Sequence, residues 1–285
     1  MDYILNKKVF FSKMHGLGND FVIINNINQN IKMSKVKIKN LSDRNTGIGF
    51  DQLLLIEKSC NKDIDFNYRI FNSNGEEVSQ CGNGARCIAK FIYSNKLTNK
   101  KNIIVSTKNR ILHLKIKNNK KILVNMGKPD FNPGSLPFIT KQNKKEYYIK
   151  IKTKNIKFSI VSLGNPHCVI LVPDILTVNI EEIGPIIENY SQFPNKVNVN
   201  FMEIINKKYI KLRVYERDVG ETKACGSGAC ASVAVGINQN LLDQKVTVEL
   251  PGGKLKIFLD KNNECIYMSG PATHIFDGYF INKNF

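Results

Sequence analysis

Long runs of apolar residues are missing from this sequence. Nowhere do the roughly 18 consecutive apolar side chains of a membrane span occur, and the first residues hold no apolar core of a secretory signal. The cysteines form no Cys-x-x-Cys pair and none of the spacings that structural zinc sites use. There are seven: Cys60, Cys81, Cys87, Cys168, Cys225, Cys230 and Cys265. We expect reduced thiols in a soluble cytoplasmic protein without a bound metal or a membrane partner.

Acidic residues are also scarce, with 24 Asp and Glu against 42 Lys and Arg, which gives a net charge of +18. A surplus of this size raises the possibility of a nucleic-acid-binding protein. The excess is mostly lysine scattered among isoleucine and asparagine, and no RNA-binding signature accompanies it. We therefore interpret it as solvated surface and expect no specific nucleic-acid partner. Scattered lysines would give only weak, steeply salt-sensitive binding, which a salt-titrated assay detects.

The pentapeptide Cys-Gly-x-Gly-Ala occurs twice, at 81–85 and at 225–229. At the same offset of 225 − 81 = 144, Arg69 and Glu77 correspond to Arg213 and Glu221. The chain of 285 residues is long enough for two domains with a core each. Proline and glycine cluster near 127–134, so we predict duplicated domains over 1–127 and 128–271.

Short β-rich segments dominate both halves, and helices are few. The two helices that matter, 84–94 and 228–237, directly follow the repeated cysteines. The second is small or apolar on every face, so we expect it to be buried. The sequence predicts an α/β fold of the α+β type, with two pseudosymmetric domains that each wrap a mostly antiparallel sheet around a central helix.

Each repeated cysteine stands at a helix N-terminus, where unpaired N–H groups and the helix dipole stabilise a thiolate. The glycines that follow, Gly82, Gly84, Gly226 and Gly228, let the backbone present N–H donors to a carboxylate. If this carboxylate belongs to a bound substrate, the α-carbon of the substrate would lie between Cys81 and Cys225. Two acid/base groups facing one carbon are what inversion of a stereocentre needs, so we predict cofactor-independent catalysis by a thiol pair.

Polar residues at turns and strand ends form a second candidate group. Amides bind ammonium and carboxylate groups alike, and arginine binds a carboxylate with two hydrogen bonds. A turn or cap is the competing interpretation for any single asparagine. Together they suggest an amino-acid site made of Asn19, Asn72, Asn165, Asn198, Glu216 and Arg217. His113 and His274 show no partner in the sequence, and we assign them structural roles.

Several motifs together resemble the diaminopimelate epimerase family over nearly the whole chain. They are Phe11–Phe21, Gly49–Gln52, Asn72–Gly75, Gln80–Cys87, Gly164–Cys168, Tyr215–Thr222 and Ala224–Cys230. The resemblance implies that family's fold and interconversion of LL- and meso-2,6-diaminopimelate, without a cofactor, in lysine and peptidoglycan precursor biosynthesis. It also implies a homodimer and a C-terminal tail, about 272–285, that packs back on the first domain. Where some members have an aromatic hydroxyl near the dimer contact, this chain has Phe276.

The resemblance also assigns roles to individual residues. Cys81 and Cys225 would be the thiol/thiolate pair, and His167 and Glu216 would stabilise the thiolate or the substrate. Substrate binding would fall to Asn19, Gln52, Asn72, Asn165, Asn198, Glu216 and Arg217. The reacting carboxylate would be held by Gly82, Asn83, Gly226 and Ser227.

Two related activities compete with this prediction. Proline or hydroxyproline racemases share the fold class and the two-cysteine logic, but act on a monocarboxylate. A second amino-acid head group needs distal ligands such as Asn72, Asn198 and Arg217, which favours diaminopimelate. Isomerases of the phenazine-biosynthesis type share the fold but do not depend on the cysteine pair.

Overall fold

The computed structural model describes residues 8–78, 81–117 and 121–282, so Gln80 of the motifs above lies outside the described residues. The chain divides into two compact units. Unit 1 contains Met1–Val124 and Pro271–Phe285, and unit 2 contains Asn125–Gly270. The division falls within one strand, β8 (Ile122–Gly127), a few residues before the boundary expected from the sequence. The C-terminal tail belongs to unit 1, and its last three residues lie outside the described part.

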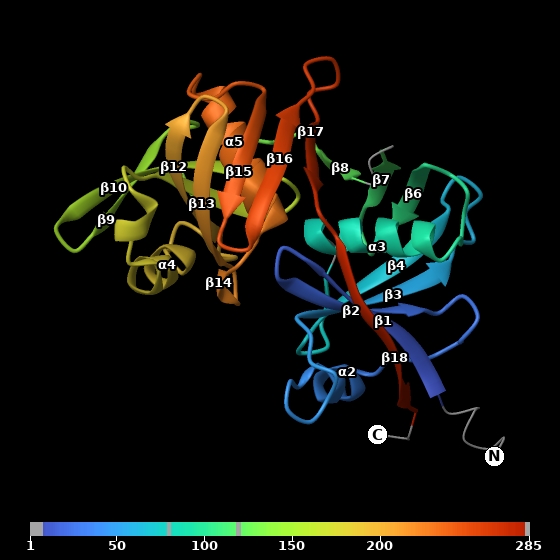
Figure 1. Cartoon of the computed structure of the whole chain (residues 1–285). Helices are drawn as coiled ribbons and strands as arrows, with labels where there is room; N and C mark the ends of the chain where they lie inside the picture. The colour runs from blue at the N-terminus through green and yellow to red at the C-terminus, as the bar shows by residue number, and fades with distance from the viewer. Residues whose placement is uncertain (1–7, 79–80, 118–120, 283–285) are drawn as a thin grey trace. The chain divides into compact units, whose positions relative to one another are not determined.

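Unit 1 is a sheet with one helix on each side (Figure 1). Its elements are β1 (Lys8–Gly16), β2 (Asn19–Asn25), α2 (Lys35–Ser42), β3 (Gln52–Lys58), β4 (Phe66–Asn72), β5 (Glu77–Val78), α3 (Gly82–Ser94), β6 (Asn102–Ser106), β7 (Ile111–Ile116), β8 and β18 (Thr273–Ile281). The β2–β3 and β4–β6 pairs are parallel. Antiparallel pairs join β1–β2, β3–β4, β4–β5, β6–β7 and β7–β8. The C-terminal strand β18 pairs antiparallel with β1.

Unit 2 repeats this pairing scheme. Its elements are β9 (Tyr147–Ile151), β10 (Lys154–Ser162), β11 (Pro166–Leu171), α4 (Ile180–Glu188), β12 (Asn198–Asn206), β13 (Tyr209–Glu216), β14 (Gly220–Thr222), α5 (Gly226–Asn238), β15 (Lys245–Leu250), β16 (Gly253–Leu259) and β17 (Ile266–Gly270), with 3-10 turns at Pro133–Ser135 and Ile175–Thr177. Here β11–β12 and β13–β15 are the parallel pairs. They correspond in order to β2–β3 and β4–β6 of unit 1.

Helices cover both faces of the central strands in unit 1. Successive side chains of a strand point to opposite faces, so a strand covered on both faces is apolar throughout. The runs 21–24 and 53–56 are of this kind and are buried. Val22 and Leu53 pack with Ile38 and Leu41 of α2. The other face receives α3, which packs on β1, β2, β3 and β7.

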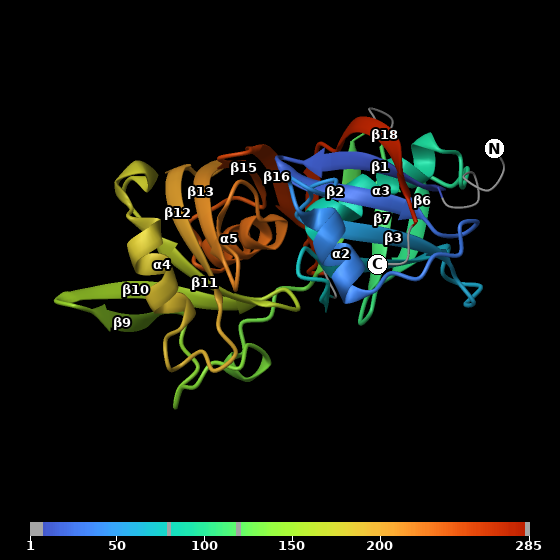
Figure 2. The ribbon, with the colours of Figure 1, turned by 90° about the horizontal axis from the view of Figure 1, so that it is seen from below.

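Unit 2 buries its central helix more completely. Every residue from 226 to 236 in α5 is buried, which confirms the expectation from its uniformly small and apolar sequence. The helix packs on β10, β11, β12, β16 and β17. Figure 2 shows it among the strands of unit 2. An aromatic cluster of Phe138, Tyr147, Phe158 and Phe193 belongs to the second core, which also contains Ile180 and Ile187 of α4.

The predicted duplication is confirmed by equivalent ion pairs. Arg69 Nη2 lies 2.8 Å from a carboxylate oxygen of Glu77, and Arg213 Nη2 lies 2.7 Å from one of Glu221. In both pairs the guanidinium Nε donates to the second oxygen of the same carboxylate. A bidentate pair therefore links β4 to β5 in one unit and β13 to β14 in the other.

Several elements were not expected from the sequence. Helix α2 alternates lysine with apolar residues, a strand-like pattern, yet Ser34 caps it by accepting the N–H of Lys37 at 3.2 Å. Helix α4 contains Pro185, which reads as a helix breaker. The expected bend over 15–20 is a two-residue turn, Leu17–Gly18, at φ 60° and 87°. Its counterpart Gly164 has φ 88°, and glycine adopts this conformation without strain.

Candidate active site

The two repeated cysteines have the same local structure. Cys81 is the N-cap of α3, and its sulfur accepts the N–H of Gly84 at 3.3 Å. Cys225 is the N-cap of α5, and its sulfur accepts the N–H of Gly228 at 3.4 Å. Each sulfur therefore lies at the positive end of a helix, where the dipole favours negative charge.

The role expected for two of the glycines needs correction. The sequence predicted that Gly84 and Gly228 would present their N–H groups to a bound carboxylate. In the structure both groups donate to the cysteine sulfur three residues before them. An N-cap side chain accepts from this position of the first turn, and here a sulfur takes the place of the usual oxygen.

In unit 1, a chain of amides approaches Cys81. Asn19 Oδ1 lies 3.8 Å from the Cys81 sulfur and accepts from Asn83 Nδ2 at 3.2 Å. Asn83 Oδ1 in turn accepts from the buried guanidinium of Arg86 at 2.8 Å. Asn19 Nδ2 donates to Asp51 at 2.9 Å. A carboxylate only accepts hydrogen bonds and a guanidinium only donates them. Asp51 and Arg86 therefore determine the orientation of the two amides between them, and Asn19 presents its oxygen to the sulfur.

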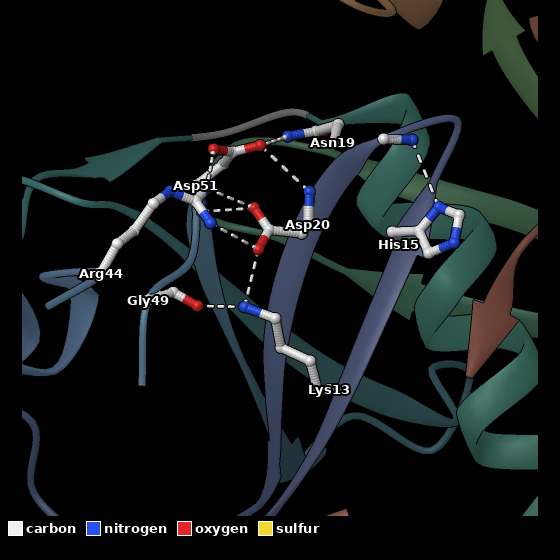
Figure 3. Close-up of polar contacts among 8 residues, drawn as sticks. Lys13, His15, Asn19, Asp20, Arg44, Gly49 and Asp51 are labelled. Atoms are coloured by element: carbon white, nitrogen blue, oxygen red, sulfur yellow. Dashed lines mark hydrogen bonds and ion pairs between the residues drawn. The ribbon is translucent and has the colours of Figure 1, made fainter. Parts of the chain in front are cut away.

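A charged cluster holds the Asn19 turn against the start of β3, as Figure 3 shows. Arg44 bridges Asp20 and Asp51, with N–O distances of 2.8 Å to each, and Lys13 lies 2.6 Å from Asp20. Burial raises the pKa of Asp20, but hydrogen bonds from Arg44 and Lys13 outweigh it and hold that pKa at about 2. Asp20 thus stays ionised near neutral pH, and the cluster fixes the chain at Asp20 and Asp51, the neighbours of Asn19 and Gln52.

Gln52 and Asn72 lie opposite each other on β3 and β4. Gln52 Nε2 donates to Asn72 Oδ1 at 2.8 Å. Gln52 Oε1 is buried and has no hydrogen-bond partner among the described residues. A buried acceptor without a partner is costly, and an ammonium group would satisfy it.

In unit 2, Cys225 lies beside a carboxylate. Its sulfur is 3.1 Å from Glu216 Oε2, and Thr222 Oγ1 donates to Glu216 Oε1 at 2.5 Å. Ser227 Oγ lies 3.5 Å from the same sulfur and accepts from Asn165 Nδ2 at 3.2 Å. Burial, and next the charge of Glu216, raises the pKa of the Cys225 thiol well above its usual range. This environment favours the protonated thiol.

A hydrogen bond joins Asn198, at the start of β12, to Arg217, just after the end of β13. Asn198 Nδ2 donates to Pro166 O at 2.8 Å, and its Oδ1 accepts the backbone N–H of Arg217 at 3.1 Å. Arg217 Nη1 donates to Asn195 O at 3.1 Å. Both polar atoms of the Asn198 amide are therefore engaged within unit 2. Asn198 orients Arg217, whose remaining guanidinium donors suit a carboxylate.

His167 is fully buried on β11, beside Asn198 on β12. Burial lowers the pKa of its imidazole to about 3, and the charge of Arg217 adds to this shift. His167 is therefore neutral near pH 7. Its Nε2 and Oδ1 of Asn165 are buried atoms without a hydrogen-bond partner among the described residues.

Sequence reasoning missed four residues that support these sites: Asp51, Arg86, Asn200 and Thr222. Asn200 carried a signal, because it follows Asn198 by two residues and so lies on the same face of a strand that is otherwise apolar. The assignment of His274 as a residue without a partner was wrong, since its Nε2 lies 2.9 Å from Asp277.

Gly228 and Gly84 give a matched test of packing at the two helix starts. A Cβ at Gly228 would come within 2.4 Å of Asn200 Oδ1, whereas at Gly84 the nearest atom is a Leu54 methyl at 3.3 Å. Gly228→Ala is expected to lower the free energy of unfolding by about 1–3 kcal/mol through overpacking. Gly84→Ala is expected to change it by less than about 1 kcal/mol. Urea denaturation measures both, and equal losses would contradict this account.

Glu216→Gln tests the electrostatic environment of Cys225. Because the carboxylate raises the thiol pKa, its removal is expected to shift the pH profile of Cys225 alkylation to lower pH. Iodoacetamide labelling from pH 7 to 10, followed by peptide mass mapping, measures this shift. The exposed Cys60 serves as the internal control and is expected to keep its profile. If the Cys225 profile stays in place or moves to higher pH, Glu216 is not a cause of the raised thiol pKa.

Comparison with known families decides the relationship. The family model described as diaminopimelate epimerase matches residues 11–132 and 159–275. The chain belongs to the diaminopimelate epimerase family. Membership places it among epimerases and isomerases, and it confirms the predicted two-domain α+β fold with few helices. The match covers both cysteine repeats and the polar residues around them.

Solved structures of the same fold cover nearly all of the chain. A phenazine biosynthesis protein of the PhzF family from Bacillus anthracis has a TM-score of 0.69 at 16% identity, covering 96% of this chain and 99% of its own. A hydroxyproline epimerase from Agrobacterium vitis has a TM-score of 0.70 at 10% identity, covering 96% and 93%. A probable proline racemase from Agrobacterium radiobacter has a TM-score of 0.66 at 11% identity, covering 95% and 92%. At these identities the likeness concerns the fold.

Among the described residues, no three His, Cys, Asp or Glu side chains gather where they would hold a metal ion. Within the same part of the chain, no helix is both long and apolar enough to cross a membrane.

Proposed function

We propose that this chain is a cofactor-independent cytoplasmic epimerase that interconverts LL- and meso-2,6-diaminopimelate for lysine and peptidoglycan precursor biosynthesis. The observation that carries the proposal is the repeated sulfur cap. Cys81 and Cys225 each accept an N–H from the first turn of a buried helix, in two units with the same strand pairing. A cysteine that only fills space in a core does not require a helix N-cap position. The same arrangement at two equivalent places is therefore better explained by catalysis than by packing.

In the proposed reaction, one sulfur removes the α-proton as a thiolate, and the other donates a proton to the opposite face of the same carbon. The electrons of the broken C–H bond move into the carboxylate, where N–H groups of the helix starts stabilise the charge. Before substrate binds, Cys225 is the protonated member, because burial and Glu216 favour its thiol. The roles of the two sulfurs exchange with the direction of reaction.

The substrate has ammonium and carboxylate groups at both ends, and each unit offers polar atoms suited to them. Gln52 Oε1 and Asn165 Oδ1 are buried acceptors without partners among the described residues, which suits an ammonium group. Arg217, oriented by Asn198, is our choice for the distal carboxylate. Gly82, Asn83, Gly226 and Ser227 begin the two helices and would surround the reacting carboxylate.

Racemisation of proline or hydroxyproline is the second candidate, favoured by the fold shared with a hydroxyproline epimerase. The two activities differ in the far end of the substrate. A cyclic monocarboxylate has no distal carboxylate for Arg217 to bind. The polar residues around Arg217 therefore favour diaminopimelate.

Exchange of the substrate α-hydrogen with deuterium tests the proposal. Purified protein is incubated in heavy water with LL-diaminopimelate, without pyridoxal phosphate or added metal, and mass spectrometry follows deuterium uptake. We expect incorporation at the α-carbon together with formation of the meso isomer. L-Proline and trans-4-hydroxy-L-proline are run in parallel. Exchange with these and none with diaminopimelate would replace the proposal with the racemase.

We also propose a homodimer, as the resemblance implies. Strands β1 and β18 expose Phe10, Ile275, Phe276 and Tyr279, with Phe276 46% exposed and its ring 6.1 Å from that of Phe11. Phe10 and Tyr279 are opposite each other on one face of this strand pair, whereas Phe276 lies on the other face beside Phe11. Exposed aromatic side chains of this kind suit a contact between copies of the chain. Light scattering on the purified protein measures the oligomeric state.

A further inference from the structure

His167 and Asn200 form a buried polar pair on the face of the unit 2 sheet that α5 covers. Asn200 Nδ2 lies 3.2 Å from His167 Nδ1, and both side chains are fully buried. The first turn of α5 lies directly against Asn200, since a Cβ added at Gly228 would collide with Asn200 Oδ1. Burying polar side chains costs desolvation free energy that an apolar pair would avoid.

Unit 1 shows that the fold does not need this pair. Gln52 pairs with Phe21 as Asn198 pairs with His167, so Phe21 stands in the place of His167. Two residues after Gln52 on β3, Leu54 stands in the place of Asn200. A Cβ added at the equivalent glycine, Gly84 or Gly228, would meet Leu54 or Asn200 respectively. The same position is apolar in one unit and polar in the other, which points to chemistry in unit 2.

The contacts of Asn200 determine which histidine nitrogen carries the proton. Its Nδ2 also donates to Cys168 O at 2.9 Å and to Asn198 O at 3.2 Å. Two carbonyls, which only accept, fix the nitrogen of the amide toward His167, and its two N–H groups are shared among these carbonyls and the ring. His167 Nδ1 must then accept, because an Nδ1–H would place two donors against each other. The proton lies on Nε2, a buried atom without a partner among the described residues.

We propose that Asn200 is a positioning residue that holds His167 in the neutral Nε2–H tautomer, so that this imidazole donates a hydrogen bond and does not accept a proton. The charge of Arg217 and the burial of the ring both oppose a second proton. The donor suits an anionic acceptor such as a substrate carboxylate, and this last point rests on the proposed function.

Nitrogen-15 NMR of histidine-labelled protein tests the tautomer without any substrate. The chain has four histidines, so loss of one signal pair in His167→Gln assigns the spectrum. We expect a protonated Nε2 and an unprotonated Nδ1 that stay unchanged from pH 8 to pH 5. A protonated Nδ1, or titration near the ordinary histidine pKa of about 6.5, would overturn the proposal.

Two substitutions test the part played by Asn200. Asn200→Asp replaces the donor with an acceptor, so it is expected to move the proton to Nδ1 and to raise the pKa of His167. Asn200→Leu, which copies Leu54, is expected to abolish the preference for one tautomer. Asn206→Asp, at the exposed end of the same strand, is the control and is expected to leave the His167 signals unchanged. Retention of the Nε2–H tautomer in both Asn200 variants would refute the role of Asn200.

Activity then separates this inference from the proposed function. We expect Asn200→Asp to lower kcat about 10- to 100-fold, as loss of an orienting partner does elsewhere, with little change in KM. A parent protein with the predicted tautomer but no turnover of diaminopimelate would contradict the proposed function alone. Full turnover in a variant whose tautomer has moved would show that the tautomer does not serve catalysis, and would overturn the inference.

Discussion

Replacing either Cys81 or Cys225 with alanine is expected to reduce kcat/KM for diaminopimelate by about 100- to 10,000-fold, the usual contribution of a positioned acid or base. Each sulfur serves one face of the α-carbon, so neither compensates for the other. The corresponding loss of transition-state stabilisation is about 3–5 kcal/mol. Interconversion of the LL and meso isomers, followed by chiral chromatography, measures the effect.

Serine variants provide the matched control for folding. A serine hydroxyl is a preferred N-cap acceptor, so Cys81→Ser and Cys225→Ser keep an acceptor for the N–H groups of Gly84 and Gly228. Their thermal stability is expected to stay near that of the parent, while their activity falls almost as far as in the alanine variants. Cys87→Ala, deeper in α3, should lose stability but keep turnover. Near-normal turnover in a folded Cys81 or Cys225 variant would end the two-base mechanism.

Arg217→Met is expected to lower kcat/KM for diaminopimelate by about one to two orders of magnitude. The lost interaction is a charge-assisted hydrogen bond to the distal carboxylate, worth about 1.5–3 kcal/mol. The Asn198 contact uses the backbone N–H of Arg217, so the variant keeps it. Alkylation of Cys225 is expected to proceed at the parent rate.

Lysine tests the same contact from the side of the substrate. It keeps the distal amine but lacks the distal carboxylate, so the parent enzyme is expected to use it very poorly. The Arg217→Met variant should then discriminate less between lysine and diaminopimelate. If the parent protein racemises lysine or proline as efficiently as diaminopimelate, the assignment of Arg217 to a distal carboxylate is wrong.

Much of the architecture could be predicted because it depends on local signals. The repeat at an offset of 144 predicted the duplicated halves, and the equivalent Arg69–Glu77 and Arg213–Glu221 pairs confirm them. The uniformly small and apolar segment after Cys225 predicted a buried helix, because a helix without a polar face needs protein on every side. The glycines after each repeated cysteine also predicted that the cysteine stands at the start of a helix.

Other features escaped prediction because their stabilisation is tertiary. Helices α2 and α4 have sequences that read as strand-like or broken, and they form because Ile38, Leu41, Ile180 and Ile187 cover sheet faces that would otherwise be exposed. The second strand partner of β1 comes from residues 273–281, far away in the sequence, and such pairing has no local pattern.

The sequence by itself determined which residues offer chemistry: two thiols at helix starts, a set of amides, one glutamate and one arginine. Only the tertiary structure decided how those groups are oriented and protonated. Asp51 and Arg86 fix the amides near Cys81, Glu216 lies against the Cys225 sulfur, and Asn200 faces the ring of His167. The reason is physical, since the direction of a hydrogen bond and the pKa of a buried group depend on neighbours that the fold brings from distant parts of the chain.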